Sequence, residues 1–482
     1  MLGLLGDNAG PIIMSWLDVA LLCGLFSSTF LAHVRLPILG VSAINLAWVF
    51  ALLLVLRART SIAPAWRAYW HLLRATGVVY AWVWVSSLNG ELPSLSAATA
   101  LRYVRYLIIG FSFLLLLHRR NALRPAQRTV YVILAGLAVV GSLEYWWPLP
   151  LVALRGEVSI YPRVSSLFGW PNQFGVLMAV GVALGTTLRH GGYIRPLHFR
   201  ASLVPFLVAL AFSGSRNGWF VLGVLLVVLA TVRVIAIAPV AIISATFALI
   251  LLTFPVTTAQ LGLGKTSILP LLDFLEVERN DDVSLTTTPA QALVPRLQLW
   301  RGALEAIRQH PLTGIGLDAF ANTICVALMG HNRFNAHNLF INVATELGLV
   351  GLGLFVFWLW VLFRSGDPRD WTTAVPLLGI GVGQLFDCFT YDYAFMTFSL
   401  FFIAAYARPR VSGDSHQAAA LRLGMTPSTT HSRPGRLAGS ISCEALSDPP
   451  YRIRCFIRAD RGCRTRAMPT DRHTSCGTRN SG

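Results

Sequence analysis

Three short polar clusters in an otherwise apolar chain carry residue types that could bind or transform a charged substrate. The first is Ser-Gly-Ser-Arg-Asn-Gly at 213–218, which joins two apolar runs with almost no loop. The planar guanidinium of Arg216 can bind a phosphate through two N–H groups at once. The glycines and serines around it leave backbone N–H groups at a helix start, which also favour an anion. We predict that Arg216 binds a phosphate, although an arginine that only reaches the lipid headgroups is the alternative.

The second cluster runs from Arg296 to Arg308 and leads into His-Pro-Leu-Thr-Gly-Ile-Gly at 310–316. Its spacing is helical. One face carries the apolar side chains, and the other carries charges: Leu297, Trp300, Leu304 and Ile307 against Arg301, Glu305 and Arg308. This pattern predicts a helix lying in the headgroup region, or a surface helix that packs down a loop. Arg296 and Arg301 would then stand at the height of a lipid pyrophosphate.

The third cluster is the stretch 336–351, where a long polar segment returns to an apolar run. Asn338, Asn342 and Glu346 follow one another at helical spacing and form a polar stripe. Ala344 and Gly348 add a pair of small residues four positions apart, which lets two helices approach closely. The stripe therefore predicts a helix docked inside a bundle.

His337 stands at the start of this third cluster, where the chain enters the apolar run. An imidazole there could take a proton from an acceptor hydroxyl at neutral pH, so we predict that His337 is a general base. A purely structural histidine is the alternative. Asn338 beside it, and Asn172 at the start of an earlier apolar run, are candidate substrate ligands; a helix-start amide without substrate contact fits Asn172 equally well.

The composition indicates that these clusters belong to a protein embedded in a lipid bilayer. Of the 482 residues 55% are hydrophobic and 13% charged, and the mean hydropathy is +0.60. Apolar runs of about 20 residues, the length that crosses a bilayer as a helix, recur as far as residue 407. We predict an all-α, polytopic bundle of about twelve transmembrane helices. The predicted spans are 11–32, 37–56, 69–88, 103–118, 129–147, 170–188, 200–214, 217–232, 234–254, 337–363, 372–388 and 392–407.

The first run contains Asp18 and lacks a small-residue cleavage site, so we expect a retained span and not a signal peptide. Arginines in alternate short loops assign those loops to the cytoplasm by the positive-inside rule. These are Arg57, Arg59 and Arg67; Arg119, Arg120, Arg124 and Arg128; Arg189, Arg195 and Arg200; Arg233; and Arg364 and Arg369. All three polar clusters then face outside. The expected organisation is helices 1–9 in 1–254, one large external loop with its amphipathic helix in 255–336, helices 10–12 in 337–407, and a tail in 408–482.

The formal net charge of +17 does not indicate a nucleic-acid partner, because about half of the excess lies in the tail. That tail holds thirteen arginines against five acidic residues. Its composition predicts disorder and attraction to anionic phospholipids of the bilayer. Its cysteines show no C-x-x-C pairing, so a zinc site there is not expected; they are Cys443, Cys455, Cys463 and Cys476.

Motifs for other chemistries are missing from the sequence. There is no G-x-x-x-x-G-K-[ST] phosphate loop, no H-E-x-x-H pair and no carboxylate cluster spaced to hold a divalent metal. We therefore expect neither a metal nor a nucleotide cofactor. Asp387 and Asp392, at the outer ends of the last two runs, would be the first ligands to consider if a metal were needed.

The three clusters, the order of the spans and the external loop resemble the bacterial O-antigen ligase superfamily over about residues 15–407. This superfamily includes O-antigen ligases, O-antigen polymerases and protein O-oligosaccharyltransferases. The resemblance implies an inner-membrane glycosyltransferase whose site faces the periplasm. It would move a glycan from an undecaprenyl pyrophosphate carrier to an acceptor hydroxyl without a metal. In such proteins arginines matching Arg216 and Arg296 hold the pyrophosphate and a histidine matching His337 activates the acceptor; the second arginine could instead be Arg301.

The resemblance leaves the acceptor open. Ligation to lipid A-core in lipopolysaccharide biosynthesis is the first hypothesis, polymerisation of O-antigen or exopolysaccharide repeats the second, and transfer to Ser or Thr of a protein the third. A polysaccharide transporter or flippase is the alternative outside the enzymes. Charges at mid-depth and inverted repeats would favour a transporter, whereas the charges here gather at the outer rim.

Overall fold

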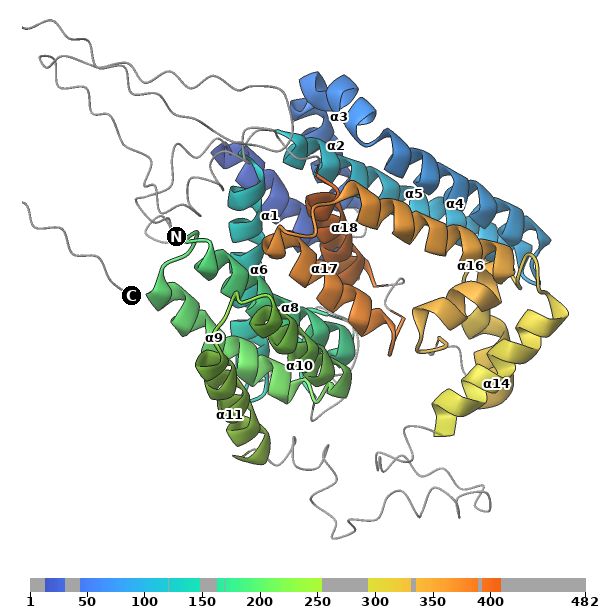
Figure 1. The fold of residues 1–482 in the computed structure, drawn as a ribbon. Helices are drawn as coiled ribbons and strands as arrows, with labels where there is room; N and C mark the ends of the chain where they lie inside the picture. Colours follow the sequence, from blue (N-terminus) through green and yellow to red (C-terminus); the bar gives the residue numbers. More distant parts are fainter. Residues whose placement is uncertain are drawn as a thin grey trace, which may run out of the picture. The chain divides into compact units, whose positions relative to one another are not determined.

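The computed structural model describes residues 14–30, 44–119, 121–147, 163–168, 170–253, 294–330, 335–388 and 392–408. The chain divides into two units, 1–410 and 411–482, and all described residues belong to the first. Every regular element among them is helical (Figure 1), which confirms the all-α class. The predicted disordered tail, and residues 255–293 of the predicted external loop, lie outside the described residues.

Each of the twelve predicted apolar runs coincides with a helix. The largest difference is at α5, which begins at Pro93 and not near 103, because proline starts a helix readily and Ser96 and Thr99 are buried in the protein. The helices of these runs are α1 (Trp16–Phe30), α2 (Ile44–Arg57), α4 (Trp70–Asn89), α5 (Pro93–His118), α6 (Leu123–Glu144), α8 (Pro171–His190), α9 (Pro196–Phe212), α10 (Arg216–Thr231), α11 (Ile237–Thr253), α16 (Leu339–Ser365), α17 (Trp371–Gln384) and α18 (Tyr393–Tyr406).

Shorter elements complete the described fold. A 3₁₀ turn (Arg59–Ser61) and α3 (Ile62–Ala68) follow α2, and a π-helical turn (Ala321–Cys325) leads into α15 (Val326–Met329). The second predicted cluster forms α14 (Val294–Gln309).

Three described helices, α5, α6 and α16, are long and apolar enough to cross a membrane, and the bent pair α2–α3 would make a fourth. Five more apolar helices are shorter. With 14 residues each, α17 and α18 reach only about 21 Å, against about 30 Å of hydrocarbon. Neither helix alone reaches across that thickness. Twelve full spans and a periplasmic loop stay predictions.

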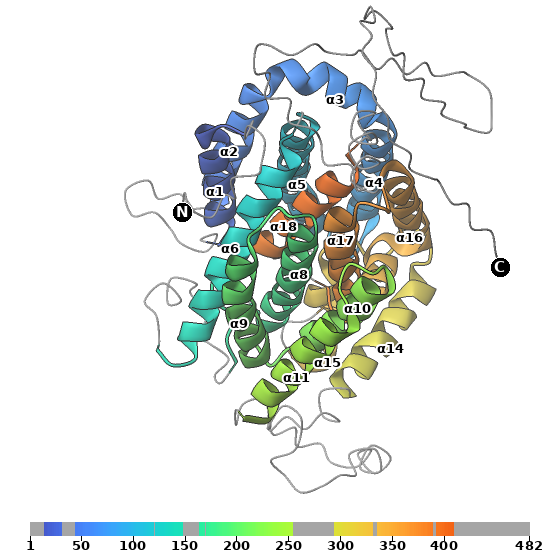
Figure 2. The same ribbon diagram turned by 60° about the vertical axis from the view of Figure 1, so that its left-hand side comes forward.

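Helix α8 forms the centre of the described bundle, with α6, α9, α10 and α17 packed around it (Figure 2). It is buried on all sides from Phe174 to Leu188. In the same core, phenylalanine rings join α1, α5 and α18; Phe26 lies 4.5 Å from Phe398 and 5.9 Å from Phe113, measured between ring centroids. This core fixes the helices from which the site residues project.

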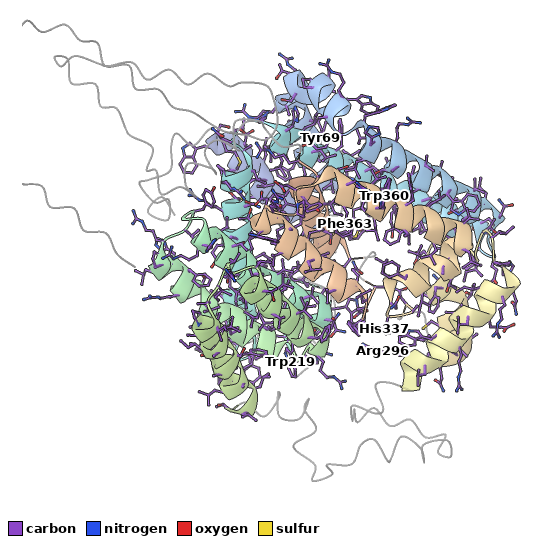
Figure 3. The ribbon with its side chains drawn as sticks, in the orientation of Figure 1. Tyr69, Trp219, Arg296, His337, Trp360 and Phe363 are labelled. Atoms are coloured by element: carbon purple, nitrogen blue, oxygen red, sulfur yellow. The ribbon has the colours of Figure 1, made fainter. Side chains whose placement is uncertain are left out.

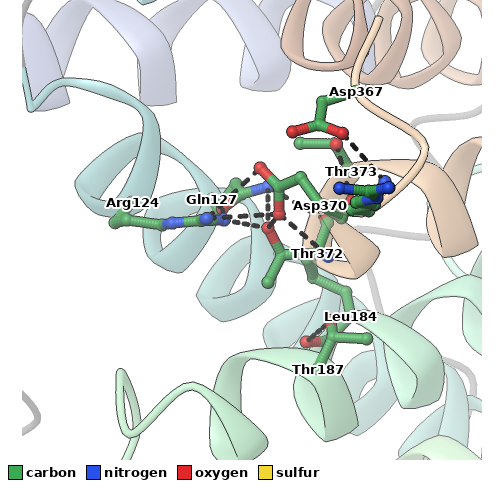
Figure 4. A network of polar contacts seen from close by, with 9 residues as sticks. Arg124, Gln127, Leu184, Thr187, Asp367, Asp370, Thr372 and Thr373 are labelled. Carbon is green, nitrogen blue, oxygen red and sulfur yellow. Dashed lines mark hydrogen bonds and ion pairs between the residues drawn. The ribbon is translucent and has the colours of Figure 1, made fainter. Parts of the chain in front are cut away.

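Arginines of two predicted cytoplasmic loops make helix-to-helix contacts. The buried carboxylate of Asp18 on α1 accepts hydrogen bonds from Arg57 Nε at 2.7 Å and Arg119 Nη1 at 3.1 Å. Near the start of α6, Arg124 pairs with Asp370 at 3.1 Å and also donates to Thr372 (Figure 4). These pairs tie α1 to α2 and α5, and α6 to α17.

Helix α16 is broken at Gly348, a feature that the sequence did not predict. The glycine has φ 71° and ψ 179°, a conformation open almost only to glycine. The chain segment 311–316 fills the break. The N–H groups of Ile315 and Gly316 donate to the carbonyls of Thr345 at 3.0 Å and Glu346 at 2.9 Å, and Leu349 N–H donates to Pro311 O at 2.8 Å. The motif at 310–316 therefore bridges the break through backbone hydrogen bonds and supports the helix that carries His337.

Gly348→Ala should destabilise the protein by at least about 1–3 kcal/mol from backbone strain alone. A Cβ at this position would also lie 2.1 Å from the carbonyl oxygen of Leu312, which is backbone and cannot move aside. Gly353→Ala, on the same helix with open space around its Cβ, is the matched control. Thermal unfolding in detergent should show a lower unfolding temperature for Gly348→Ala than for Gly353→Ala. Equal stability of the two variants would contradict the role of segment 311–316 in bridging the break.

Candidate active site

A chain of four polar side chains connects three segments that are far apart in the sequence. Arg163 Nη2 donates to Asn172 Oδ1 at 2.7 Å, and Asn172 Nδ2 donates to Asp387 Oδ2 at 2.9 Å. The other oxygen of Asp387 lies 3.0 Å from His337 Nδ1. The structure thus brings together two of the predicted site residues, His337 and Asn172, with Arg163 and Asp387 between and beside them.

His337 occupies a tightly constrained backbone position. Its φ is +49°, in the left-handed region that non-glycine residues rarely adopt. The next residue, Asn338, begins α16 by accepting the N–H of Ile341 at 3.0 Å, and its amide donates to Leu385 O at 2.8 Å. Strained positions of this kind cluster at functional sites. If Nδ1 donates its proton to Asp387, Nε2 is the ring nitrogen that can accept a proton.

Asp387 lies between α17 and α18 and is 8% exposed. Its oxygens accept hydrogen bonds from the Asn172 amide and from the Cys388 N–H at 2.9 Å, and they face His337 Nδ1. These contacts stabilise the ionised carboxylate, which can in turn support a charged imidazole.

Three arginines from different segments gather beside this chain. Arg163 also donates through Nε to Ser213 O at 2.8 Å. Burial, followed by the charges of Arg216 and Arg296, lowers the pKa of Arg163 to about 10, and the charge of Asp387 opposes the shift. Arg163 is still a cation at neutral pH. A cluster of three like charges is unfavourable by itself and favours an anion between them.

The sequence around Arg216 explains how it is held. Gly214 takes a φ of +58° in the turn after α9, and Ser215 caps α10 by accepting the Gly218 N–H at 3.0 Å. Asn217 donates to Gly383 O at 2.8 Å and so anchors this turn to α17. Ser215 thus uses one of the backbone N–H groups that we expected to be open to an anion, and the Arg216 side chain is exposed.

Helix α14 carries Arg296 and packs through a different face from the one predicted. The buried residues are Leu299 and Ala303, which meet Phe320 and Ala336, whereas Leu304 is 53% exposed. The predicted face was wrong at Leu304 because the helix packs against α16 and against the helical stretch 321–329. Trp300 Nε1 donates to Ala336 O at 2.6 Å, one residue before His337. Figure 3 labels Arg296 on α14 and His337 at the start of α16.

The choice between Arg296 and Arg301 is now supported by geometry. Five residues turn a helix by about 140° beyond one full turn, so the two arginines point to different sides of α14. The charge of Arg296 acts on Arg163, and Arg301 is exposed. Arg296 is therefore the arginine that the structure places near Arg163 and Arg216.

The polar stripe of α16 is buried, as predicted. Asn342 and Glu346 are each 2% exposed, and Asn342 Oδ1 accepts the Ala336 N–H at 3.4 Å. The stripe therefore docks the helix and fixes the segment before His337. Asn172 and Asn338 have both ends of their amides bonded to protein groups, so their direct contact with a substrate stays a prediction.

The sequence analysis assigned no role to Arg163 and did not place Asp387 beside His337. Arg163 lies in a predicted outer segment, as Arg216 does, so its position against the positive-inside trend was the signal that could have found it. Asp387 was considered only as a reserve metal ligand. Within the described ranges, no group of three or more His, Cys, Asp and Glu side chains could hold a metal ion.

Comparison with known families points in the same direction as the sequence motifs. Residues 201–356 match the family described as O-antigen ligase. The match supports the resemblance of the chain to the O-antigen ligase superfamily. It contains Arg216, Arg296 and His337, whereas Arg163 and Asp387 lie outside it. No curated protein sequence matches the chain.

Members of the O-antigen ligase family are glycosyltransferase-like ligases and polymerases, and the match supports an enzyme of this general kind. Such enzymes use a glycan donor and an acceptor in a membrane, which agrees with the apolar helices of the described fold.

Proposed function

We propose that this protein transfers a glycan from an undecaprenyl pyrophosphate carrier to an acceptor hydroxyl on the periplasmic side of the inner membrane. The observation that carries the proposal is the convergence of three arginines with a His–Asp pair. Cations fixed beside a general base match the needs of a reaction whose leaving group is a pyrophosphate.

In the proposed reaction the pyrophosphate of the donor lies among Arg163, Arg216 and Arg296. His337 Nε2 accepts the proton of the acceptor hydroxyl, and the oxygen attacks the anomeric carbon of the glycan. The bond between this carbon and the pyrophosphate oxygen breaks, and the carrier pyrophosphate leaves with the electron pair. Asp387 is a positioning residue that stabilises the imidazolium formed in this step.

Among acceptors, lipid A-core is our first choice, followed by the growing O-antigen or exopolysaccharide chain, and then Ser or Thr of a protein. The glycolipids of a deletion strain distinguish them. If the deletion strain makes lipid A-core without O-antigen, the protein is a ligase. If it makes core with a single repeat, the protein is a polymerase, and if a protein loses its glycan, that protein is the acceptor. A transporter or flippase would instead leave the donor on the wrong side of the membrane.

Turnover with purified lipid-linked donor should persist in excess chelator and without a nucleotide. The fixed arginines would supply the positive charge that a metal supplies in other enzymes. Transfer by the wild-type protein is measured before and after chelator treatment, then with magnesium or manganese added back. Activity that disappears and returns specifically with either metal would contradict the mechanism and make Asp387 and Asp392 the first ligands to test.

A further inference from the structure

Arg105 lies on the 26-residue α5, one of the helices long and apolar enough to cross a membrane, and stands at the outer end of the predicted span 103–118. A charged side chain inside an apolar span is costly, and such residues generally belong to a functional site. Arg105 is not part of the group around His337 described above. Its surroundings therefore need an explanation of their own.

Two aromatic rings hold the Arg105 side chain. Its guanidinium carbon lies 5.7 Å from the centroid of the Trp48 ring on α2 and 5.3 Å from that of the Tyr393 ring on α18. Ring faces attract a cation but do not accept strong hydrogen bonds. Arg105 Nε is buried without a hydrogen-bond partner, and no ion pair joins the side chain to another described residue. The cation is thus held between two ring faces, and its buried Nε donor is not used by the described protein groups.

The approach to this site is through lipid. Val49 and Leu52, on the same helix as Trp48, are 50% and 54% exposed, and Leu101, one turn before Arg105, is 59% exposed. Exposed apolar side chains on a candidate spanning bundle face acyl chains. An anion that reaches Arg105 from this side has to be attached to a lipid.

Arg105 also adjoins the helix that follows Asp387 in the chain. Tyr393, whose ring faces the Arg105 guanidinium, begins α18 six residues after Asp387. The proposed donor site uses Arg163, Arg216 and Arg296, so Arg105 is available to a second lipid-linked substrate.

We propose that Arg105, held between Trp48 and Tyr393, binds a phosphate of a lipid-anchored acceptor. This inference rests on the proposed glycosyl transfer and narrows it, because it favours a phosphorylated lipid-linked acceptor over a protein. The ligand chemistry is a phosphate on a lipid, which an acceptor glycolipid or an ordinary anionic phospholipid could supply.

The test uses purified full-length protein in nanodiscs, with a phosphorylated lipid-linked acceptor and the same acceptor after phosphatase treatment. Arg105→Gln should raise the acceptor KM about 10- to 100-fold, the effect of losing hydrogen bonds to a charged group, and leave the donor KM unchanged. Dephosphorylation should raise the acceptor KM of the wild-type protein by a similar factor and have little further effect on the variant. Arg102→Gln, an exposed arginine one turn away, is the matched control and should behave like wild type.

Several results would overturn the inference. An equal rise in acceptor KM on dephosphorylation, in the wild-type protein and in Arg105→Gln, would show that Arg105 does not contact that phosphate. Dependence of the Arg105 effect on the phospholipid composition of the nanodisc, and not on the acceptor phosphate, would assign the site to a phospholipid. Transfer only to a protein acceptor would refute the acceptor site while leaving glycosyl transfer standing, whereas no transfer to any acceptor would contradict the proposed function itself. If Arg105→Gln does not accumulate, Arg105→Lys supplies the same comparison, with a smaller expected rise in KM.

Discussion

His337→Ala should lower glycan transfer by about 10²–10⁴-fold, the usual contribution of a general base. Without the imidazole, no group hydrogen-bonded to Asp387 is left to accept the proton of the acceptor hydroxyl. The protein should still insert and accumulate, because the start of α16 is held by Asn338 and not by the His337 side chain. The measurement is the turnover of purified variant with lipid-linked donor at saturating acceptor.

His310→Ala is the matched control for this variant. His310 is a second described histidine near the outer loop, and its Nε2 lies 3.6 Å from Glu91 at a partly exposed position. It should retain activity close to that of the wild type. Near-wild-type turnover in His337→Ala would remove His337 from the reaction and leave the His–Asp pair as a structural contact.

Arg216→Lys should also be strongly damaging although it keeps the positive charge. A lysine is a point charge and cannot reproduce the two parallel hydrogen bonds of a guanidinium to a pyrophosphate. Loss of one preorganised donor to the developing charge typically costs about 3–4 kcal/mol, or about 10²–10³-fold in rate. The effect is read as kcat and donor KM of the purified variant.

Arg308→Lys controls for a general effect of replacing arginine, because the Arg308 side chain is 79% exposed at the far end of α14. It should leave both constants unchanged. Full activity in Arg216→Lys would indicate a loose electrostatic role for this residue and would shift pyrophosphate binding to Arg163 and Arg296.

Local patterns in the sequence were enough to predict most of the helices. Apolar runs need only length and hydropathy, and each predicted run coincides with a helix. The short turn at Arg216 was also predicted, since the two runs around it leave no room for a loop. Likewise, the position of His337 follows from the point where the chain re-enters an apolar run.

Contacts between distant segments could not be predicted in this way. Gly348 looks like any small residue of an apolar helix, and its break becomes visible only when residues 311–316 donate to the freed carbonyls. The pairing of Asn172 with Asp387 joins residues 215 positions apart. The buried face of α14 depends on its packing against α16 and the helical stretch 321–329, so periodicity alone placed Leu304 wrongly on the buried face.

The most direct measurement is the stoichiometry of the reaction with purified protein, labelled undecaprenyl-pyrophosphate-linked glycan and a hydroxyl acceptor. We predict that one carrier pyrophosphate is released for every glycan transferred, that release requires the acceptor, and that neither a metal nor a nucleotide is needed. Movement of the intact donor across a vesicle membrane without release of the carrier pyrophosphate would contradict glycosyl transfer and identify the protein as a transporter.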